Sequence, residues 1–276
     1  MPKFSAHLSM LYPDLDLPDR IDAAARDGFK GVECSFPYSH APRILAERLR
    51  GNGVQQVLIN APPGQVEAGD RGITCHPHKE QAFRRDMAKA VEYARELNCQ
   101  RIHVMAGISQ AGVSPEAARA TYLSNLEYAA ALTSPLGIDV LIEPINQRDI
   151  PGYFLNRQAD AHAMIQQIGA DNIKVQFDLY HCQIVEGDLA TRIRQYLPTG
   201  RVGHFQIAGV PQRHEPDLGE VNYPFLFNLI DELSAQCNWV GWIGCEYRPV
   251  RGLQPGGTTA GLGWLRNLTD GLEGKG

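Results

Sequence analysis

The chain has 276 residues and a formal net charge of −5, and 43% of its residues are hydrophobic. This length suits one α/β barrel, which uses about 250 residues, and it is enough to bury about three quarters of the unfolded surface. The acidic balance and the lack of a long basic run argue against nucleic acid or an anionic membrane as a partner. We therefore expect a small-molecule partner.

The sequence predicts neither export nor membrane insertion. The first stretch, MPKFSAHLSMLYPDLDLP, lacks the apolar core of a signal peptide, and no run of about 18 apolar residues follows. The six cysteines are scattered without CxxC spacing, which is typical of reduced thiols in a cytoplasmic protein. We expect a cytoplasmic protein without a membrane span, and the sequence leaves open whether it forms a homo-oligomer.

Short apolar runs and amphipathic stretches alternate along the whole chain. The predicted strands cover 3–10, 30–36, 54–60, 100–107, 139–146, 173–181, 202–209 and 240–248. The predicted helices cover 18–27, 41–52, 77–97, 114–134, 158–169, 186–197, 222–236 and 258–270. Repeated βα units with right-handed crossovers predict an α/β fold, a single (β/α)8 TIM barrel spanning residues 1–276, rather than an open sheet.

Oxygen-bearing side chains stand at the ends of the last four predicted strands. The run VLIEPINQ reaches Glu143, and the next three strands reach Asp178, Gln206 and Glu246. Adjacent barrel strands bring such ends together, and three carboxylates at close quarters need a cation or a shared proton. Carboxylate and amide oxygens suit a hard ion such as Mg²⁺ or Mn²⁺ better than structural zinc. Any one of these acids could simply be solvated, but four such residues on one rim predict a divalent metal site.

The segments around these residues are LIEPIN, QFDLYH, GHFQIAG followed by VPQRHEP and GEVNY, and GCEYRP, with SMLY, NAPPG and HVMAG earlier in the chain. They resemble the hydroxypyruvate isomerase family of the xylose-isomerase-like barrels over nearly the whole length. The resemblance implies that Glu143, Asp178, Gln206 and Glu246 bind the metal, and that Glu143 and Glu246 are the catalytic acids that exchange the substrate proton. Related ketose epimerases carry a histidine at the position of Gln206, a difference that favours the hydroxypyruvate isomerase side.

The chemistry agrees with these residue types. Moving a carbonyl to the neighbouring carbon requires loss of a proton alpha to the carbonyl, an enediolate, and return of the proton. A divalent ion beside both substrate oxygens stabilises the enediolate. The predicted reaction is therefore the conversion of hydroxypyruvate to tartronate semialdehyde.

Other functions stay open on the same scaffold, because fold alone does not decide function. A 2-oxo-tetronate isomerase or a keto-sugar 3-epimerase would use the same groups. A metal-dependent endonuclease is disfavoured, since it would need more zinc ligands and a basic surface. A non-catalytic sugar-binding barrel would tolerate loss of a proton-transfer acid, yet both glutamates are present.

Four further residues are candidates for substrate binding. His181, three residues after Asp178, could donate a hydrogen bond to a substrate oxygen, or could cap or pack a helix start. Arg213 lies in the long irregular stretch 207–221, and could hold a carboxylate through two parallel hydrogen bonds or be an ordinary loop cation. His7 and His103 lie within predicted strands and could face the barrel mouth or be packed.

Three more features have a plainer interpretation. The CHPH segment with His76 and His78 looks like a metal pair, but its proline favours a helix start. His204, in a predicted strand, is expected to be packed and hydrogen-bonded. Glu33 could be a structural or a substrate-binding acid.

Overall fold

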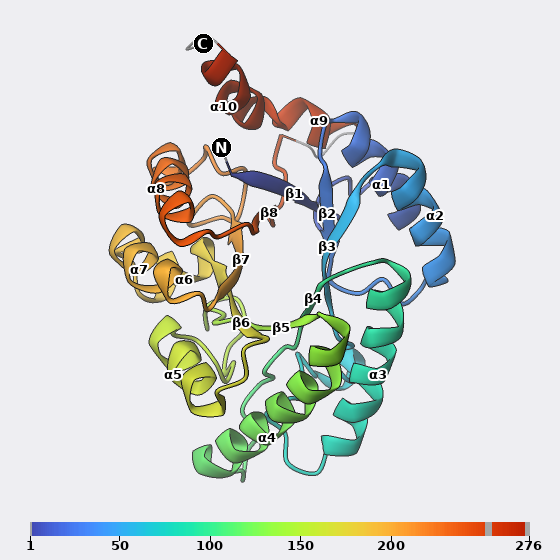
Figure 1. The fold of residues 1–276 in the computed structure, drawn as a ribbon, viewed down its shortest axis with the longest axis vertical. Coiled ribbons are helices and arrows are strands. Elements are labelled where there is room, and N and C mark those ends of the chain that lie inside the picture. Colours follow the sequence, from blue (N-terminus) through green and yellow to red (C-terminus); the bar gives the residue numbers. More distant parts are fainter. Residues whose placement is uncertain (1, 252–255, 274–276) are drawn as a thin grey trace.

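The computed structural model describes residues 2–251 and 256–273. Its strands are parallel and close into a barrel in chain order, which confirms the predicted fold (Figure 1). Each strand therefore pairs with its neighbours in sequence, and β8 pairs with β1. The strands are β1 (Lys3–His7), β2 (Gly31–Cys34), β3 (Gln55–Asn60), β4 (Arg101–His103), β5 (Asp139–Ile142), β6 (Ile173–Asp178), β7 (Val202–Ile207) and β8 (Trp242–Cys245).

The helices surround the strands as an outer ring (Figure 1). They are α1 (Leu17–Arg26), α2 (Pro42–Asn52), α3 (Glu80–Glu96), α4 (Pro115–Thr133), α5 (Gln158–Ile168), α6 (Leu179–Val185), α7 (Leu189–Tyr196), α8 (Tyr223–Cys237), α9 (Gly257–Gly261) and α10 (Gly263–Glu273), with short 3-10 turns at Val66–Ala68, Ser134–Leu136 and Leu197–Thr199. Proline stands in the first turn of α1, α2, α4 and α8, where a missing amide costs little.

Several predicted boundaries were wrong. The predicted strands 3–10, 100–107 and 139–146 are shorter and end at His7, His103 and Ile142. The predicted strand 173–181 ends at Asp178, where α6 begins, because the Asp178 side chain accepts hydrogen bonds from two amides of the first helical turn. The next helix starts at Leu189 rather than at 186, since α6 occupies the preceding residues. The predicted helix 77–97 starts at Glu80, after His78 in a left-handed conformation with φ of 69°. The predicted helix 258–270 is split between α9 and α10, with Leu262 between them.

The barrel interior changes character along its axis. Near the amino ends of the strands, Val57, Leu141 and Trp242 belong to a small buried apolar cluster. A Cβ on Gly31 would lie 2.7 Å from both Trp242 and Val57, so glycine makes room for the indole. Toward the carboxyl ends the buried side chains become polar, and this is the end at which TIM barrels place their sites.

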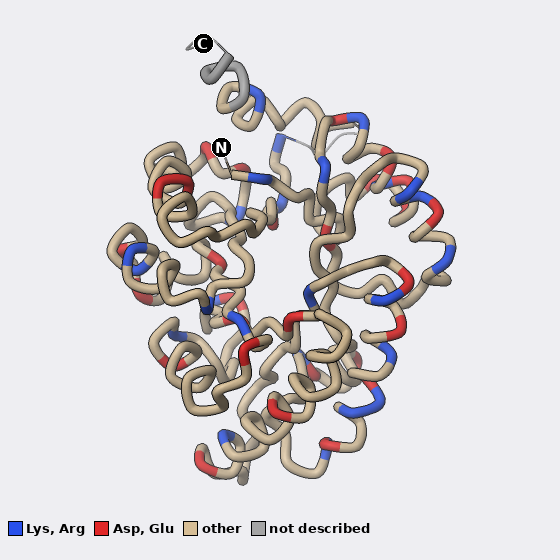
Figure 2. The backbone as a smooth tube through the Cα atoms, viewed as in Figure 1, with Lys and Arg blue, Asp and Glu red and all other residues tan. Residues whose placement is uncertain are grey.

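Charged residues lie mostly on the outer helices, with the two signs interspersed (Figure 2). Of the helices that the structure describes, none is long and apolar enough to cross a membrane.

Candidate active site

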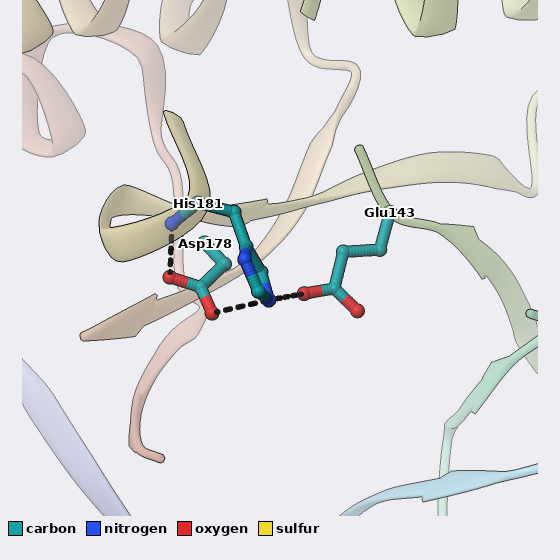
Figure 3. Close-up of side chains that lie close together, drawn as sticks. All are labelled: Glu143, Asp178 and His181. Atoms are coloured by element: carbon teal, nitrogen blue, oxygen red, sulfur yellow. Dashed lines mark hydrogen bonds and ion pairs between the residues drawn. The ribbon is translucent and has the colours of Figure 1, made fainter. Parts of the chain in front are cut away.

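Glu143 and Asp178 face the same histidine at the carboxyl end of the barrel (Figure 3). Glu143 directly follows β5, and Asp178 is the last residue of β6. The Nε2 atom of His181 lies 3.7 Å from Glu143 Oε1 and 3.6 Å from Asp178 Oδ2. One ligand atom from each of the three residues lies within 4.8 Å of the others, and all three side chains are buried. In the described part of the chain, these residues are the group of three or more His, Cys, Asp or Glu side chains that could hold a metal ion.

The two oxygens of Asp178 have different surroundings. Oδ1 accepts hydrogen bonds from the amides of Tyr180 at 2.7 Å and His181 at 3.3 Å, and so caps α6. Oδ2 is buried and has no hydrogen-bond partner among the described residues. Glu143 Oε1 is likewise buried and without a hydrogen-bond partner among the described residues. Buried carboxylate oxygens without donors are costly, so the arrangement calls for a cation or a proton between them.

The tautomer of His181 follows from its neighbour Asn146. The Asn146 Oδ1 atom accepts a hydrogen bond from the amide of Asp149 at 2.8 Å, so its Nδ2 group must face His181 Nδ1, 2.6 Å away. The backbone amide of Asn146 also donates to that nitrogen. Because Nδ1 accepts, a neutral ring carries its proton on Nε2. His181 is thereby set as a hydrogen-bond donor toward the site rather than as a metal ligand, despite its position.

Arg213 and Glu246 complete the rim. Glu246 follows β8, and its Oε1 atom lies 3.2 Å from an Arg213 guanidinium nitrogen. The same nitrogen is 3.8 Å from Asp178 Oδ2, while the other terminal nitrogen is 3.7 Å from Asp149. The guanidinium also lies over the Tyr180 ring at 5.0 Å. Arg213 is thus held by acids on three sides and is far from an ordinary solvated loop cation.

The loop after β7 turns back over the mouth to deliver this arginine. Arg213 has a left-handed backbone with φ of 61°, and its amide donates to Gly209. A Cβ on Gly209 would come within 2.2 Å of the Leu218 carbonyl, so only glycine permits the close approach within the loop. The Arg213 carbonyl accepts from the amide of Arg248, beyond β8.

The two candidate catalytic glutamates each have a histidine beside them. His103 Nδ1 is 3.6 Å from Glu143 Oε2, and His7 Nε2 is 3.6 Å from Glu246 Oε1. Both histidines are buried and face the mouth side of the barrel. The structure therefore places all four predicted substrate-binding residues around the predicted acids.

Gln206 is buried, and both the nitrogen and the oxygen of its amide are hydrogen-bonded within the barrel. Its Nε2 group donates to Glu33 Oε1 at 2.8 Å, and its Oε1 atom accepts from Gln176 at 2.6 Å. Gln206 is paired in register with Asp178 on β6, so the two side chains occupy the same level of the barrel. Gln206 remains a predicted ligand, with one oxygen lone pair left over.

Burial sets the ionisation of the site. Burial raises the pKa of Glu143 well above its usual value, and the nearby charges of Glu246 and Asp178 raise it further. Burial raises the pKa of Asp178 to about 7, although Arg213 opposes the shift. Burial also lowers the pKa of His181 well below its usual value, and Arg213 adds to this. A divalent cation would favour the ionised acids, so the residues fit one.

The weaker candidates do not join the group formed by Glu143, Asp178 and His181. His76 is buried and its Nε2 group donates to the Ile108 carbonyl at 2.8 Å, whereas His78 is exposed, so the CHPH histidines do not form a metal pair. His204 is packed and hydrogen-bonded, as expected, and its partner is Glu33. Glu33 is completely buried, far from the role of a solvated acid.

The closed parallel barrel with acidic residues at one rim defines the class of protein. The chain belongs to the xylose isomerase-like TIM barrel family, whose model matches residues 21–268. The predicted family membership is confirmed.

Two relatives of the chain are isomerases by name. The chain is 53% identical over 266 residues to the 2-oxo-tetronate isomerase of Cupriavidus necator, covering 96% of this chain and 98% of that protein. It is 42% identical over 265 residues to the hydroxypyruvate isomerase of Escherichia coli K12, with coverages of 96% and 98%. It is also similar to a crystal structure from Brucella melitensis described as an AP endonuclease of family 2, with TM-score 0.89, 41% identity and coverages of 96% and 98%.

Sequence reasoning missed the groups that support the site. Asn146 sets the tautomer of His181, and Asp149 with Tyr180 holds Arg213. Gln176 lies between Gln206 and Glu143, where its hydrogen bonding opposes the rise in the Glu143 pKa. Asp178 directly precedes LYHC, and because aspartate is a preferred N-cap it could have indicated the start of α6, which carries Tyr180.

Proposed function

We propose that this protein is a metal-dependent isomerase that moves the carbonyl of a short 2-oxo acid between C2 and C3. The observation that carries the proposal is the pair of buried, unpartnered oxygens on Glu143 and Asp178, which meet beside a histidine donor and the Arg213–Glu246 pair. The names of the relatives at 53% and 42% identity support the same chemistry.

Glu143, Asp178, Glu246 and the oxygen of Gln206 would hold the ion, with Mg²⁺ or Mn²⁺ the proposed species because the donors are hard oxygens. When bound, the ion supplies positive charge that makes the carbon beside the substrate carbonyl more acidic. Its presence would also bring the raised pKa values of Glu143 and Asp178 back down.

The chain's own residues supply proton transfer and orientation. Glu143 and Glu246 directly follow β5 and β8, and one of them removes the proton at C3 while the proton returns at C2. The Nε2 proton of His181 is donated to a substrate oxygen and stabilises charge as it develops there. Arg213 binds the substrate carboxylate and keeps C2 and C3 between the glutamates.

Two substrates satisfy these demands, and they differ only at C3. Hydroxypyruvate has two hydrogens beside its C3 hydroxyl, and conversion yields tartronate semialdehyde. A 2-oxo-tetronate replaces one of these hydrogens with a hydroxymethyl group, and the 53% identical relative favours this alternative. A neutral ketohexose has no carboxylate for the planar guanidinium of Arg213 to bind.

We also propose that the protein works in the cytoplasm. Its six free cysteines support this location, because cytoplasmic proteins rarely contain disulfides.

The deciding experiment is a comparison of rates on metal-loaded and metal-free protein. The protein is stripped with chelator, analysed for residual metal, and assayed with hydroxypyruvate, a 2-oxo-tetronate and a ketohexose after addition of Mg²⁺ or Mn²⁺. We expect turnover of at least one of the two acids, lost on stripping and restored by metal. Equal turnover by metal-free protein would refute the metal role. Turnover of the ketohexose alone would refute the acid substrate, and cleavage of an abasic DNA duplex without isomerase activity would refute the reaction class.

A further inference from the structure

A completely buried carboxylate, Glu33, lies below the rim and takes no part in the proposed chemistry. It projects from β2 and receives three hydrogen bonds from two other strands. The hydroxyl of Ser5 donates to Oε2 at 3.0 Å and the Nε2 group of His204 donates to the same oxygen at 2.7 Å. The amide of Gln206 donates to Oε1 at 2.8 Å.

The fold makes space for this carboxylate at a specific point. A Cβ on Gly244, in β8, would lie 2.2 Å from Glu33 Oε1 and 2.6 Å from its carboxyl carbon. Gly244 is paired in register with Gln206 on β7 and with Ser5 on β1. Glu33 therefore crosses the barrel interior and ends in a gap that glycine leaves between two of its donors. An alanine at 244 would push the carboxylate away from them.

The hydrogen bonds decide which way the Gln206 amide is turned. With donors from Ser5 and His204 already on its oxygens, the Glu33 carboxylate acts as an acceptor, so it takes the NH₂ group of Gln206 and not its carbonyl. The carbonyl oxygen is then directed to the opposite side. There it accepts one bond from Gln176 at 2.6 Å and keeps its second lone pair. Asp178 stands at the same level on the adjacent strand.

We propose that Glu33 is a positioning residue, which holds the Gln206 amide so that its oxygen, and not its nitrogen, is presented to the divalent ion. The inference rests on the proposed metal site. A reversed amide would offer NH₂ to the ion, and a neutral amide nitrogen does not bind a hard cation. Residues that orient metal ligands in this way usually contribute about 10- to 100-fold to metal affinity.

The test measures Mn²⁺ binding to the full chain by isothermal titration calorimetry, together with thermal unfolding to confirm folding. In Glu33→Gln the new amide can either donate or accept, so Gln206 is no longer forced into one orientation. We expect Mn²⁺ affinity to fall about 10-fold or more. The matched control is Ser5→Ala, which removes a donor to Glu33 but leaves Gln206 held, and it should stay within about twofold of wild type.

A double variant separates orientation from packing. The double variant Glu33→Gln/Gln206→Glu places the amide at position 33 and the carboxylate at position 206. A carboxylate at position 206 presents an oxygen to the ion in either orientation. Because a carboxylate also adds ligand charge, the double variant is compared with Gln206→Glu alone. The two should bind Mn²⁺ equally well, whereas a Glu33 that only fills space would leave the double variant weaker. Should Glu33→Gln fail to fold, Gly244→Ala displaces the carboxylate while keeping all of the polar groups, and the same loss is expected.

The outcomes distinguish this inference from the proposed function. Wild-type protein that binds no Mn²⁺ would refute the metal site itself. Wild-type protein that binds Mn²⁺, together with unchanged affinity in folded Glu33→Gln or in Gly244→Ala, would overturn only the role of Glu33. An equal loss in Ser5→Ala, or a double variant that binds Mn²⁺ more weakly than Gln206→Glu alone, would likewise overturn it by showing a general loosening of the barrel interior.

Discussion

Replacing Arg213 tests the substrate assignment directly, since two variants separate its charge from its shape. Arg213→Lys keeps a cation near the acids but loses the planar fork that matches a carboxylate. Arg213→Ala loses both. At the observed separation of 3.2 Å from Glu246 Oε1, a pair of unit charges interacts by about 5 kcal/mol at an effective dielectric constant of about 20. The positive charge of Arg213 therefore stabilises the neighbouring carboxylates as well as the bound substrate.

The two variants should differ in how much they raise the KM for the acid and in whether they alter the pKa of Asp178. Loss of one charge-assisted hydrogen bond costs about 2 kcal/mol, so Arg213→Lys should raise the KM for the 2-oxo acid by roughly 30-fold. Metal affinity should change little in this variant, because the positive charge remains. In Arg213→Ala the pKa of Asp178, about 7 with the arginine present, should rise by about one unit or more.

The assay is steady-state kinetics with the acid, and competitive inhibition by dihydroxyacetone as a neutral ketose of the same length as hydroxypyruvate. Manganese titration of each variant is the parallel measurement. The inhibition constant of dihydroxyacetone should be nearly the same in wild type and in Arg213→Lys. An unchanged KM for the acid in Arg213→Lys, or an equal weakening of the acid and the neutral ketose, would refute the assignment of Arg213 to the substrate carboxylate.

Three further outcomes are expected. Asp178→Asn should weaken Mn²⁺ binding and thermal stabilisation by Mn²⁺, since a charged ligand is lost, and an unaltered titration would remove Asp178 from the ligand set. Glu143→Gln and Glu246→Gln should each lower kcat by about 10² to 10⁴-fold and slow deuterium incorporation at C2 in deuterated water, and near wild-type exchange would exclude that glutamate as the base. Burial lowers the pKa of His162, which stacks on Tyr196, from 6.5 to about 4. As pH falls from about 6.5 to about 4, this histidine is protonated in the unfolded chain but stays neutral in the folded protein, so the free energy of unfolding decreases. Wild type should therefore lose roughly 3 kcal/mol more than His162→Phe over this range in denaturant unfolding, and parallel pH curves would contradict the buried neutral imidazole.

The sequence by itself determined the barrel and the outline of its rim. Alternating apolar runs and helical stretches predict eight βα units, and parallel strands in chain order leave one way to close them. Glu143, Asp178, Gln206 and Glu246 could be recognised because each stands where an apolar run ends, and all strand ends of one kind meet at one rim. These are local patterns, so a single chain is enough to show them.

Only the tertiary structure decided how those side chains are oriented. Arg213 reaches the acids through a left-handed turn in a loop that folds back over the mouth. The proton of His181 is set by Asn146 from the loop after the preceding strand, and the amide of Gln206 is turned by Glu33 from across the barrel, 173 residues away in sequence. Such contacts depend on strand register and barrel closure, which bring together residues that share no sequence periodicity. Sequence patterns therefore locate the groups at the rim, while the closed barrel decides which atom each of them presents.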